Sequence, residues 1–160
     1  MSRPRILYSG ILVGLAGSVS VAIWFFLYDL AAGVPFRTPA LLGAMLFEGL
    51  RDPAALAITP GLVLKYSVVH GLAFLIFGVA AAGLFALADR DPHALFFVFM
   101  LFCCFEVAML AALMILESWL LTALQPWAII GANLVAVVVM LGILFRDHQT
   151  SFSELLTSGE

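Results

Sequence analysis

Charged side chains are scarce in this sequence. Its 160 residues include seven Lys and Arg and ten Asp and Glu, so 11% are charged while 64% are hydrophobic, and the formal net charge is -3. Soluble domains carry about 25% charged residues. The composition therefore excludes a water-soluble globular protein. No basic patch is present to neutralise phosphates, so no nucleic-acid partner is expected.

Cysteine is almost absent, and motifs for enzyme chemistry are missing. Cys103 and Cys104 are adjacent, and neighbours on a helix point about 100° apart, so they are poorly placed to bridge each other or to share a metal. We interpret both as inert thiols. The sequence contains no glycine-rich phosphate loop, zinc-binding histidine pair, CxxC motif or nucleophile elbow. It therefore predicts no catalytic residue and no metal site, and favours a protein that is not an enzyme.

Long apolar runs dominate the chain. A bilayer core about 30 Å thick needs about 20 helical residues. Four runs meet this length with at most one acidic or basic residue each; they cover residues 6–28, 66–88, 94–116 and 127–145. The first run is longer and bulkier than a signal peptide, so we expect it to be retained. The fold predicted is all-α: an integral membrane four-helix bundle forming a single transmembrane domain over residues 1–160.

The direction of insertion rests on a small bias in basic residues. The side of the two termini has Arg3, Arg5, Arg90 and Arg146, and the other side has Arg37, Arg51 and Lys65. This bias predicts that both termini are cytoplasmic. Amphipathic rings favour an interface, and most of these rings are predicted near the outer one: Trp24, Tyr28, Tyr66, Trp119 and Trp127.

The connection between the first two spans is long enough to have its own structure. Thr38 could cap a helix start, Pro39 suits a first turn, and residues 39–50 contain leucines at helical spacing on one face. Asp52 and Pro53 end the pattern. We predict a short amphipathic helix at the outer interface. It could be a strut or lid, or else a gate over a cavity or a helix that docks a partner.

Small residues predict where the helices approach each other, because close approach drives much of helix packing in lipid. Gly10, Gly14 and Ser18 form a stripe on the first span, and Gly71 and Gly78 lie on the second. The same stripes could receive helices of another subunit.

Polar residues inside the spans are functional candidates because they are costly in lipid. At about 1.5 Å per residue, His70 and Asn133 fall at one depth, and Glu106 and Ser18 fall deeper, near the midplane. The depths therefore pair His70 with Asn133 and Glu106 with Ser18. A single network of all four residues is also compatible with these depths. Asp29, Lys65 and Tyr66 are predicted at the outer edge, where an Asp29–Lys65 ion pair is geometrically feasible.

Glu106 is the sharpest of these signals. A carboxylate near the midplane without a cation is strongly disfavoured, so we predict that Glu106 is neutral and donates to Ser18 or a backbone carbonyl. The favoured interpretation is interhelical packing. The alternative is proton or cation handling.

His70 raises the question of a cofactor. Two histidines at one depth would be needed to hold a haem between them, but His93 and His148 fall at the cytoplasmic side. A single axial histidine, a ligand shared with another chain, or a ligand-poor site with Glu106 are the remaining options. Tyr66 and Phe74 lie one turn away and could form an aromatic pocket for a quinone or pigment. A hydrogen-bonded packing histidine is the favoured interpretation.

The stretch WFFLYDLAAGVPFRTPALLGAML (residues 24–46), together with His70 and Phe105-Glu106, resembles small uncharacterised four-span proteins of bacterial inner membranes. The resemblance implies a location and no activity. The leading hypothesis is a non-catalytic subunit or assembly factor of a larger inner-membrane complex of respiratory or photosynthetic type. The alternatives are a small oligomeric transporter or channel that uses Glu106 and His70, and a cofactor-binding membrane protein that uses His70.

Overall fold

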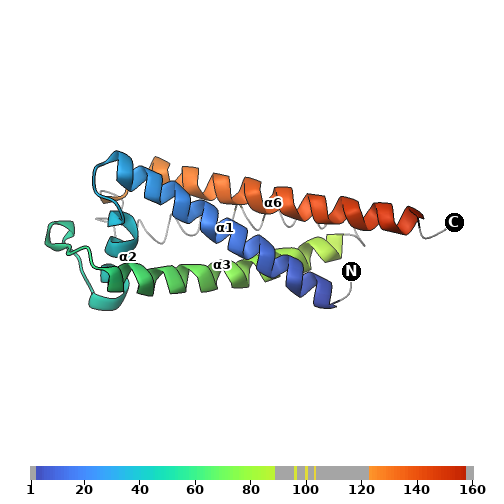
Figure 1. The fold of residues 1–160 in the computed structure, drawn as a ribbon, viewed down its shortest axis with the longest axis horizontal. Coiled ribbons are helices and arrows are strands. Elements are labelled where there is room, and N and C mark those ends of the chain that lie inside the picture. The colour runs from blue at the N-terminus through green and yellow to red at the C-terminus, as the bar shows by residue number, and fades with distance from the viewer. Residues whose placement is uncertain (1–2, 89–95, 97–99, 101–102, 104–122, 158–160) are drawn as a thin grey trace.

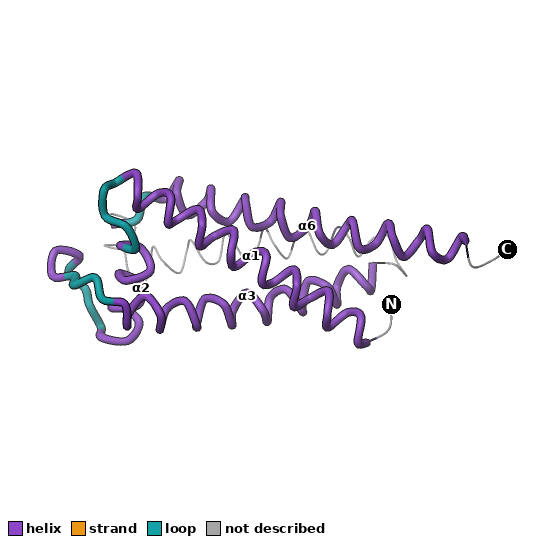
Figure 2. Tube along the Cα trace, viewed as in Figure 1, coloured by secondary structure: helices purple, strands orange, loops and turns teal. Residues whose placement is uncertain are grey.

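The computed structural model describes residues 3–88, 96, 100, 103 and 123–157. Within these residues the chain forms helices and loops and no strand (Figure 2). The elements are α1 (Arg3–Ala31), α2 (Arg37–Glu48), the short 3-10 helix η1 (Pro53–Ala55), α3 (Pro60–Ala88) and α6 (Pro126–Thr157). The all-α prediction is confirmed for this part of the chain.

Three of the described helices are long and apolar enough to cross a membrane: Pro4–Ala31, Pro60–Leu87 and Pro126–Arg146. They match three of the predicted spans and support an integral membrane protein. Apart from residues 96, 100 and 103, the span predicted at 94–116 lies outside the described residues. The second span begins six residues before its predicted start, because α3 continues through Lys65 to a proline that suits a first helical turn.

α1 crosses α3 at its glycines (Figure 1). A methyl group added at Gly10 would lie 2.5 Å from Cα of Val79, and one added at Gly14 would lie 2.5 Å from the Phe74 carbonyl oxygen. Gly78 faces the backbone of Gly10 and Gly14 in return. No described atom lies within 4 Å of a Cβ added at Gly71, so a packing role for this residue stays a prediction. Backbone contact between α1 and α3 thus depends on three of the predicted glycines.

α6 packs against the other side of α1. A Cβ at Gly131 would lie 2.5 Å from the ring of Trp24, and the indole Nε1 of Trp24 donates to the Ala128 carbonyl at 2.9 Å. Deeper in the bundle, Val13 and Met140 are fully buried together. These contacts hold α1 between α3 and α6.

α2 lies at the end of the bundle where α1 ends and where α3 and α6 begin (Figure 1). It begins after Phe36, which has a left-handed φ of 64°, and ends at Glu48, before Gly49 with a φ of 67°. Gly43 meets the Leu62 carbonyl of α3, and Leu41 is buried with Leu124 and Ile129 near the start of α6. The helix predicted at 39–50 therefore exists, two residues earlier in the chain. It is packed against α3 and against residues next to α6.

The start of α2 corrects the predicted cap. Thr38 is the second residue of the helix, and the residue at the cap position, Phe36, has no capping side chain. The Thr38 amide donates instead to the carboxylate of Asp29, at the end of α1. Nine residues separate the two, so local sequence patterns for helix caps do not reveal the interaction.

Candidate ligand-binding cavity

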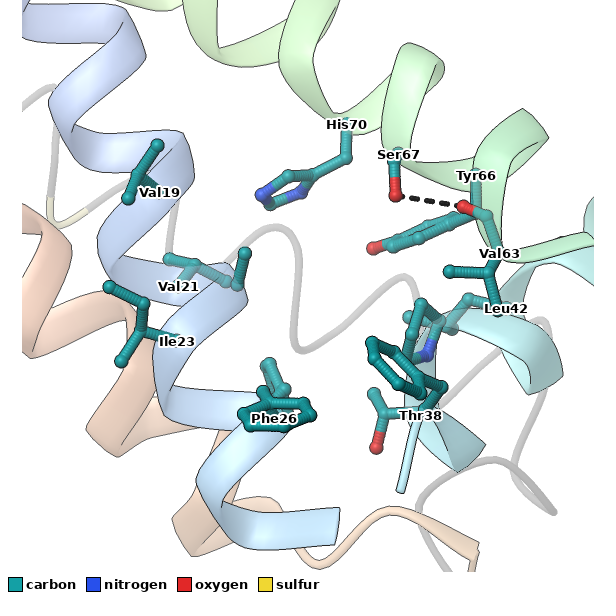
Figure 3. A pocket seen from close by; sticks show the side chains of 14 residues that line it. Val19, Val21, Ile23, Phe26, Thr38, Leu42, Val63, Tyr66, Ser67 and His70 are labelled. Carbon is teal, nitrogen blue, oxygen red and sulfur yellow. Dashed lines mark hydrogen bonds between the residues drawn. The ribbon is translucent and has the colours of Figure 1, made fainter. Parts of the chain in front are cut away.

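A cavity of about 320 Å³ lies between α1, α2 and α3 (Figure 3). Most of its lining is apolar, and the polar members of the lining are Thr38, Tyr66, Ser67 and His70. The apolar lining residues are Val19, Val21, Ala22, Ile23, Phe25, Phe26, Phe36, Pro39, Leu42 and Val63. Concave apolar sites of about 300–1,000 Å³ with a few polar groups are typical of small-molecule binding.

One face of α3 supplies an aromatic column to this region. Tyr66, His70 and Phe74 are spaced four residues apart, so they lie above one another on the helix. The ring centroids of Tyr66 and His70 are 5.7 Å apart with an interplanar angle of 27°, and those of His70 and Phe74 are 4.7 Å apart. The stacked ring of Tyr66 and the tilted ring of Phe74 hold the imidazole in place from both sides.

His70 Nε2 lies 3.3 Å from the backbone carbonyl oxygen of Ser18 on α1. A carbonyl oxygen can only accept, so Nε2 is the donor, and in the neutral imidazole Nδ1 then has the lone pair. The nitrogen that would most readily reach a haem iron is thus engaged with the protein. This geometry disfavours an axial-ligand role for His70 and leaves Nδ1 as a hydrogen-bond acceptor.

The four polar groups of the cavity differ in their remaining hydrogen-bonding capacity. Ser67 Oγ donates to the Val63 carbonyl at 2.8 Å, and Thr38 Oγ1 donates to Asp29 Oδ1 at 2.7 Å. The Tyr66 hydroxyl forms no hydrogen bond with any described residue, and it points into the cavity alongside the imidazole of His70 (Figure 3). The hydroxyl hydrogen of Tyr66 and the Nδ1 lone pair of His70 are therefore available to a ligand, whereas Ser67 and Thr38 can still only accept.

Asp29 is buried, with 1% of its surface exposed. Its two carboxylate oxygens accept from the amide and the hydroxyl of Thr38, each at 2.7 Å. The amides at a helix start have no partners within the helix and favour negative charge, which stabilises a carboxylate in this position. Asp29 thus positions Thr38 and the wall of the cavity that α2 forms.

The outer-edge residues predicted together are arranged differently. Asp29 contacts Thr38, whereas the Nζ of Lys65 lies 5.7 Å from the ring centroid of Phe47 on α2. Asp29 and Lys65 form no ion pair within the described structure. Tyr66 lines the cavity, and its place at the outer edge stays a prediction.

The intramembrane residues are brought together only in part. The backbone of Ser18 meets His70, a pair that the predicted depths did not indicate. The reason is that α3 begins at Pro60, six residues before the predicted start of its span, so His70 lies further along the helix than expected. Asn133 is half-buried on α6, makes an interaction of its own and does not line the cavity. Glu106 lies outside the described residues.

One cavity residue, Phe36, was missed from the sequence. Phe36 lines the cavity with a left-handed backbone, and its ring packs on Phe26 with centroids 5.1 Å apart. Gly33 and Pro35 predict a bend in this part of the chain. They do not show which side chain near the bend faces the cavity.

Metal ligation finds no support in the described part of the chain, where no three His, Cys, Asp or Glu side chains cluster. Comparisons with known proteins add nothing: no family model, no curated protein and no solved structure matches this chain. The resemblance to small inner-membrane proteins stays a prediction. The fold and cavity define the class, a helical membrane protein with an apolar cavity near one end of its spans.

Proposed function

We propose that this protein is a non-catalytic membrane protein that binds a lipid-soluble small molecule in the cavity between α1, α2 and α3. One observation carries the proposal: an apolar cavity of about 320 Å³ contains two polar side chains with unused hydrogen-bonding capacity. Apolar walls with few polar groups give orientation and selectivity to a bound ligand. Of the hypotheses drawn from the sequence, this is closest to a cofactor-binding protein that uses His70.

Access from the bilayer supports this proposal. Val19 and Ile23 line the cavity and are each 54% exposed, so the wall that α1 forms opens sideways. A molecule dissolved in lipid could enter between α1 and α3 without crossing water. The ligand class that fits is therefore hydrophobic over most of its surface.

A cavity-filling variant tests the proposal. Ala22 lines the cavity on α1, and Ala22→Phe would place a ring in it. Ala80→Phe is the matched control, because Ala80 is exposed on α3 and does not line the cavity. Native mass spectrometry of protein extracted with mild detergent should find a bound small molecule on the wild type and on Ala80→Phe, and none on Ala22→Phe. Equal occupancy in all three proteins, or no bound molecule on the wild type, would defeat the proposal.

The directions of the helices support a four-span bundle. α3 and α6 both run away from the end where α2 lies, so the chain between them returns from one end of the bundle to the other (Figure 1). A span at 94–116 would make that return. The N- and C-terminal ends of the drawn chain lie towards the same end, which agrees with the proposal that both termini are cytoplasmic in a bacterial inner membrane.

A subunit or assembly role is the second candidate. Gly71 lies on a span and offers open space on the described surface, beside the exposed side chain of Leu72. A small residue of this kind suits close approach by a helix of another chain. Stoichiometric co-purification of another membrane subunit that Gly71→Leu abolishes would establish this role, and a native mass equal to one chain would exclude it. Transport through Glu106 stays a prediction, since Glu106 lies outside the described residues.

A further inference from the structure

The hydrogen-bonding groups of the cavity carry information about the ligand. We infer that the cavity recognises an amphiphile whose ring head carries a hydroxyl group, of the quinol or phenol class, with Tyr66 and His70 as its two polar contacts. This inference rests on the proposed function and adds the chemistry of the ligand head to it.

The first contact is an acceptor. The Ser18 carbonyl accepts a hydrogen bond from Nε2 of His70, and the stacked ring of Tyr66 and the tilted ring of Phe74 keep the imidazole in that orientation. In the neutral ring Nδ1 can only accept. A ligand group that satisfies Nδ1 must therefore donate a hydrogen.

The second contact both donates and accepts. The phenol of Tyr66 is one helical turn from His70, and its hydroxyl points into the same space (Figure 3). Since Ser67 and Thr38 have already donated their hydrogens within the protein, Tyr66 is the remaining hydroxyl donor of the cavity.

A single hydroxyl group on the ligand matches both contacts. It can donate to Nδ1 of His70 and accept from the Tyr66 hydroxyl. A carbonyl group in the same place can only accept, so it would satisfy Tyr66 and leave Nδ1 without a hydrogen. A methyl ether lacks the hydrogen in the same way. The site therefore selects a hydroxyl over a carbonyl or an ether.

The walls indicate the rest of the ligand. The cavity extends along α1 from Val19 to Phe26, about 10 Å at about 1.5 Å per residue. This size suits one ring with a short substituent, and the rings of Phe26 and Phe36 close one end. An aliphatic tail would leave past the exposed Val19 and Ile23 into lipid. A ring head with a tail is the general form of a membrane-soluble quinol.

Binding of three probes to the whole protein in nanodiscs tests the inference. The probes are a decyl-substituted benzoquinol kept reduced without oxygen, the corresponding benzoquinone, and the dimethyl ether of the quinol. The quinol should bind about five- to tenfold more tightly than the other two, which corresponds to one additional hydrogen bond.

Variants assign the contacts. His70→Phe keeps an aromatic ring in the column and removes the acceptor, so it should bring the affinities for quinol and quinone to within about twofold of each other. Tyr66→Phe should weaken the binding of both. Tyr28→Phe is the matched control, since Tyr28 does not line the cavity, and it should behave as the wild type. Circular dichroism and elution volume verify that each variant is folded.

The outcomes separate the two proposals. Equal affinity of the wild type for all three probes overturns the hydroxyl selectivity. If the probes then fail to bind to Ala22→Phe, the proposed cavity function stands. If no probe binds but a native molecule binds to the wild type and not to Ala22→Phe, the quinol class is wrong and the cavity function stands. If neither a probe nor a native molecule binds, both are wrong.

Discussion

The buried carboxylate of Asp29 at the end of α1 holds the start of α2 through Thr38. Its two oxygens accept from the Thr38 amide and hydroxyl at 2.7 Å each, and both residues are 1% exposed. Because Thr38 also lines the cavity, this contact connects the stability of the loop between the first two spans to the shape of the cavity.

Asp29→Ala should lower the free energy of unfolding by about 2–3 kcal/mol, because it removes two hydrogen bonds to a charged acceptor and leaves the Thr38 groups without a partner. Asp29→Asn keeps one carbonyl oxygen and should cost less. Thermal unfolding in detergent, followed by circular dichroism, measures both. Asp52→Asn is the control: Asp52 Oδ1 accepts from the Ala54 amide at 2.9 Å in an exposed turn, and asparagine keeps this acceptor, so stability should change by less than about 1 kcal/mol. If Asp29→Ala unfolds like the wild type, the contact does not stabilise the loop.

Gly78→Ala should destabilise the bundle by about 1–3 kcal/mol, since its methyl group would collide with the backbone of α1 at Gly10 and Gly14. Gly71→Ala is the matched substitution on the same helix. No described atom opposes it, so the better helix propensity of alanine should leave stability unchanged or raise it by up to about 1 kcal/mol. Unfolding of both variants in the same detergent checks the pair. An equal loss of stability in Gly78→Ala and Gly71→Ala would contradict the placement of the α1–α3 crossing at Gly78.

Phe36→Asn should speed ligand release. Asparagine tolerates the left-handed φ of 64° found at Phe36, so the backbone turn should persist while the ring that packs on Phe26 is lost. We expect the dissociation rate of the decyl benzoquinol to rise about tenfold, measured by stopped-flow displacement. Phe47→Asn is the control, because Phe47 has the same 47% exposure and lies outside the lining. An unchanged rate in Phe36→Asn would show that the ring does not close the cavity.

Reporter fusions should place both ends of the chain on the cytoplasmic side. α3 and α6 run in parallel directions (Figure 1), and the proposed four crossings would leave both ends of the chain on one side. A fluorescent protein that matures only in the cytoplasm, fused in turn to each end, should be bright in both positions. A dark C-terminal fusion beside a bright N-terminal one would indicate three spans instead.

The sequence by itself determined the helical class and three described spans, because apolar length alone decides whether a helix can cross a bilayer. It also located the glycines at the α1–α3 crossing and named Tyr66, His70 and Phe74 as one aromatic face, since helical periodicity is a local property. The short helix between the first two spans was predicted to within two residues.

Only the tertiary structure decided which groups meet. Depths counted from the predicted span ends could not show that the Ser18 backbone meets His70, because α3 begins six residues before the predicted start of its span. Nor could they show that Asp29 turns inward to Thr38 and not to Lys65, because a carboxylate satisfied by a helix start needs no cation beside it. The cavity is a product of three helices meeting, and its chemistry depends on which hydrogen bonds the protein has already made. Those choices arise from contacts between residues far apart in the chain, and local sequence patterns do not contain them.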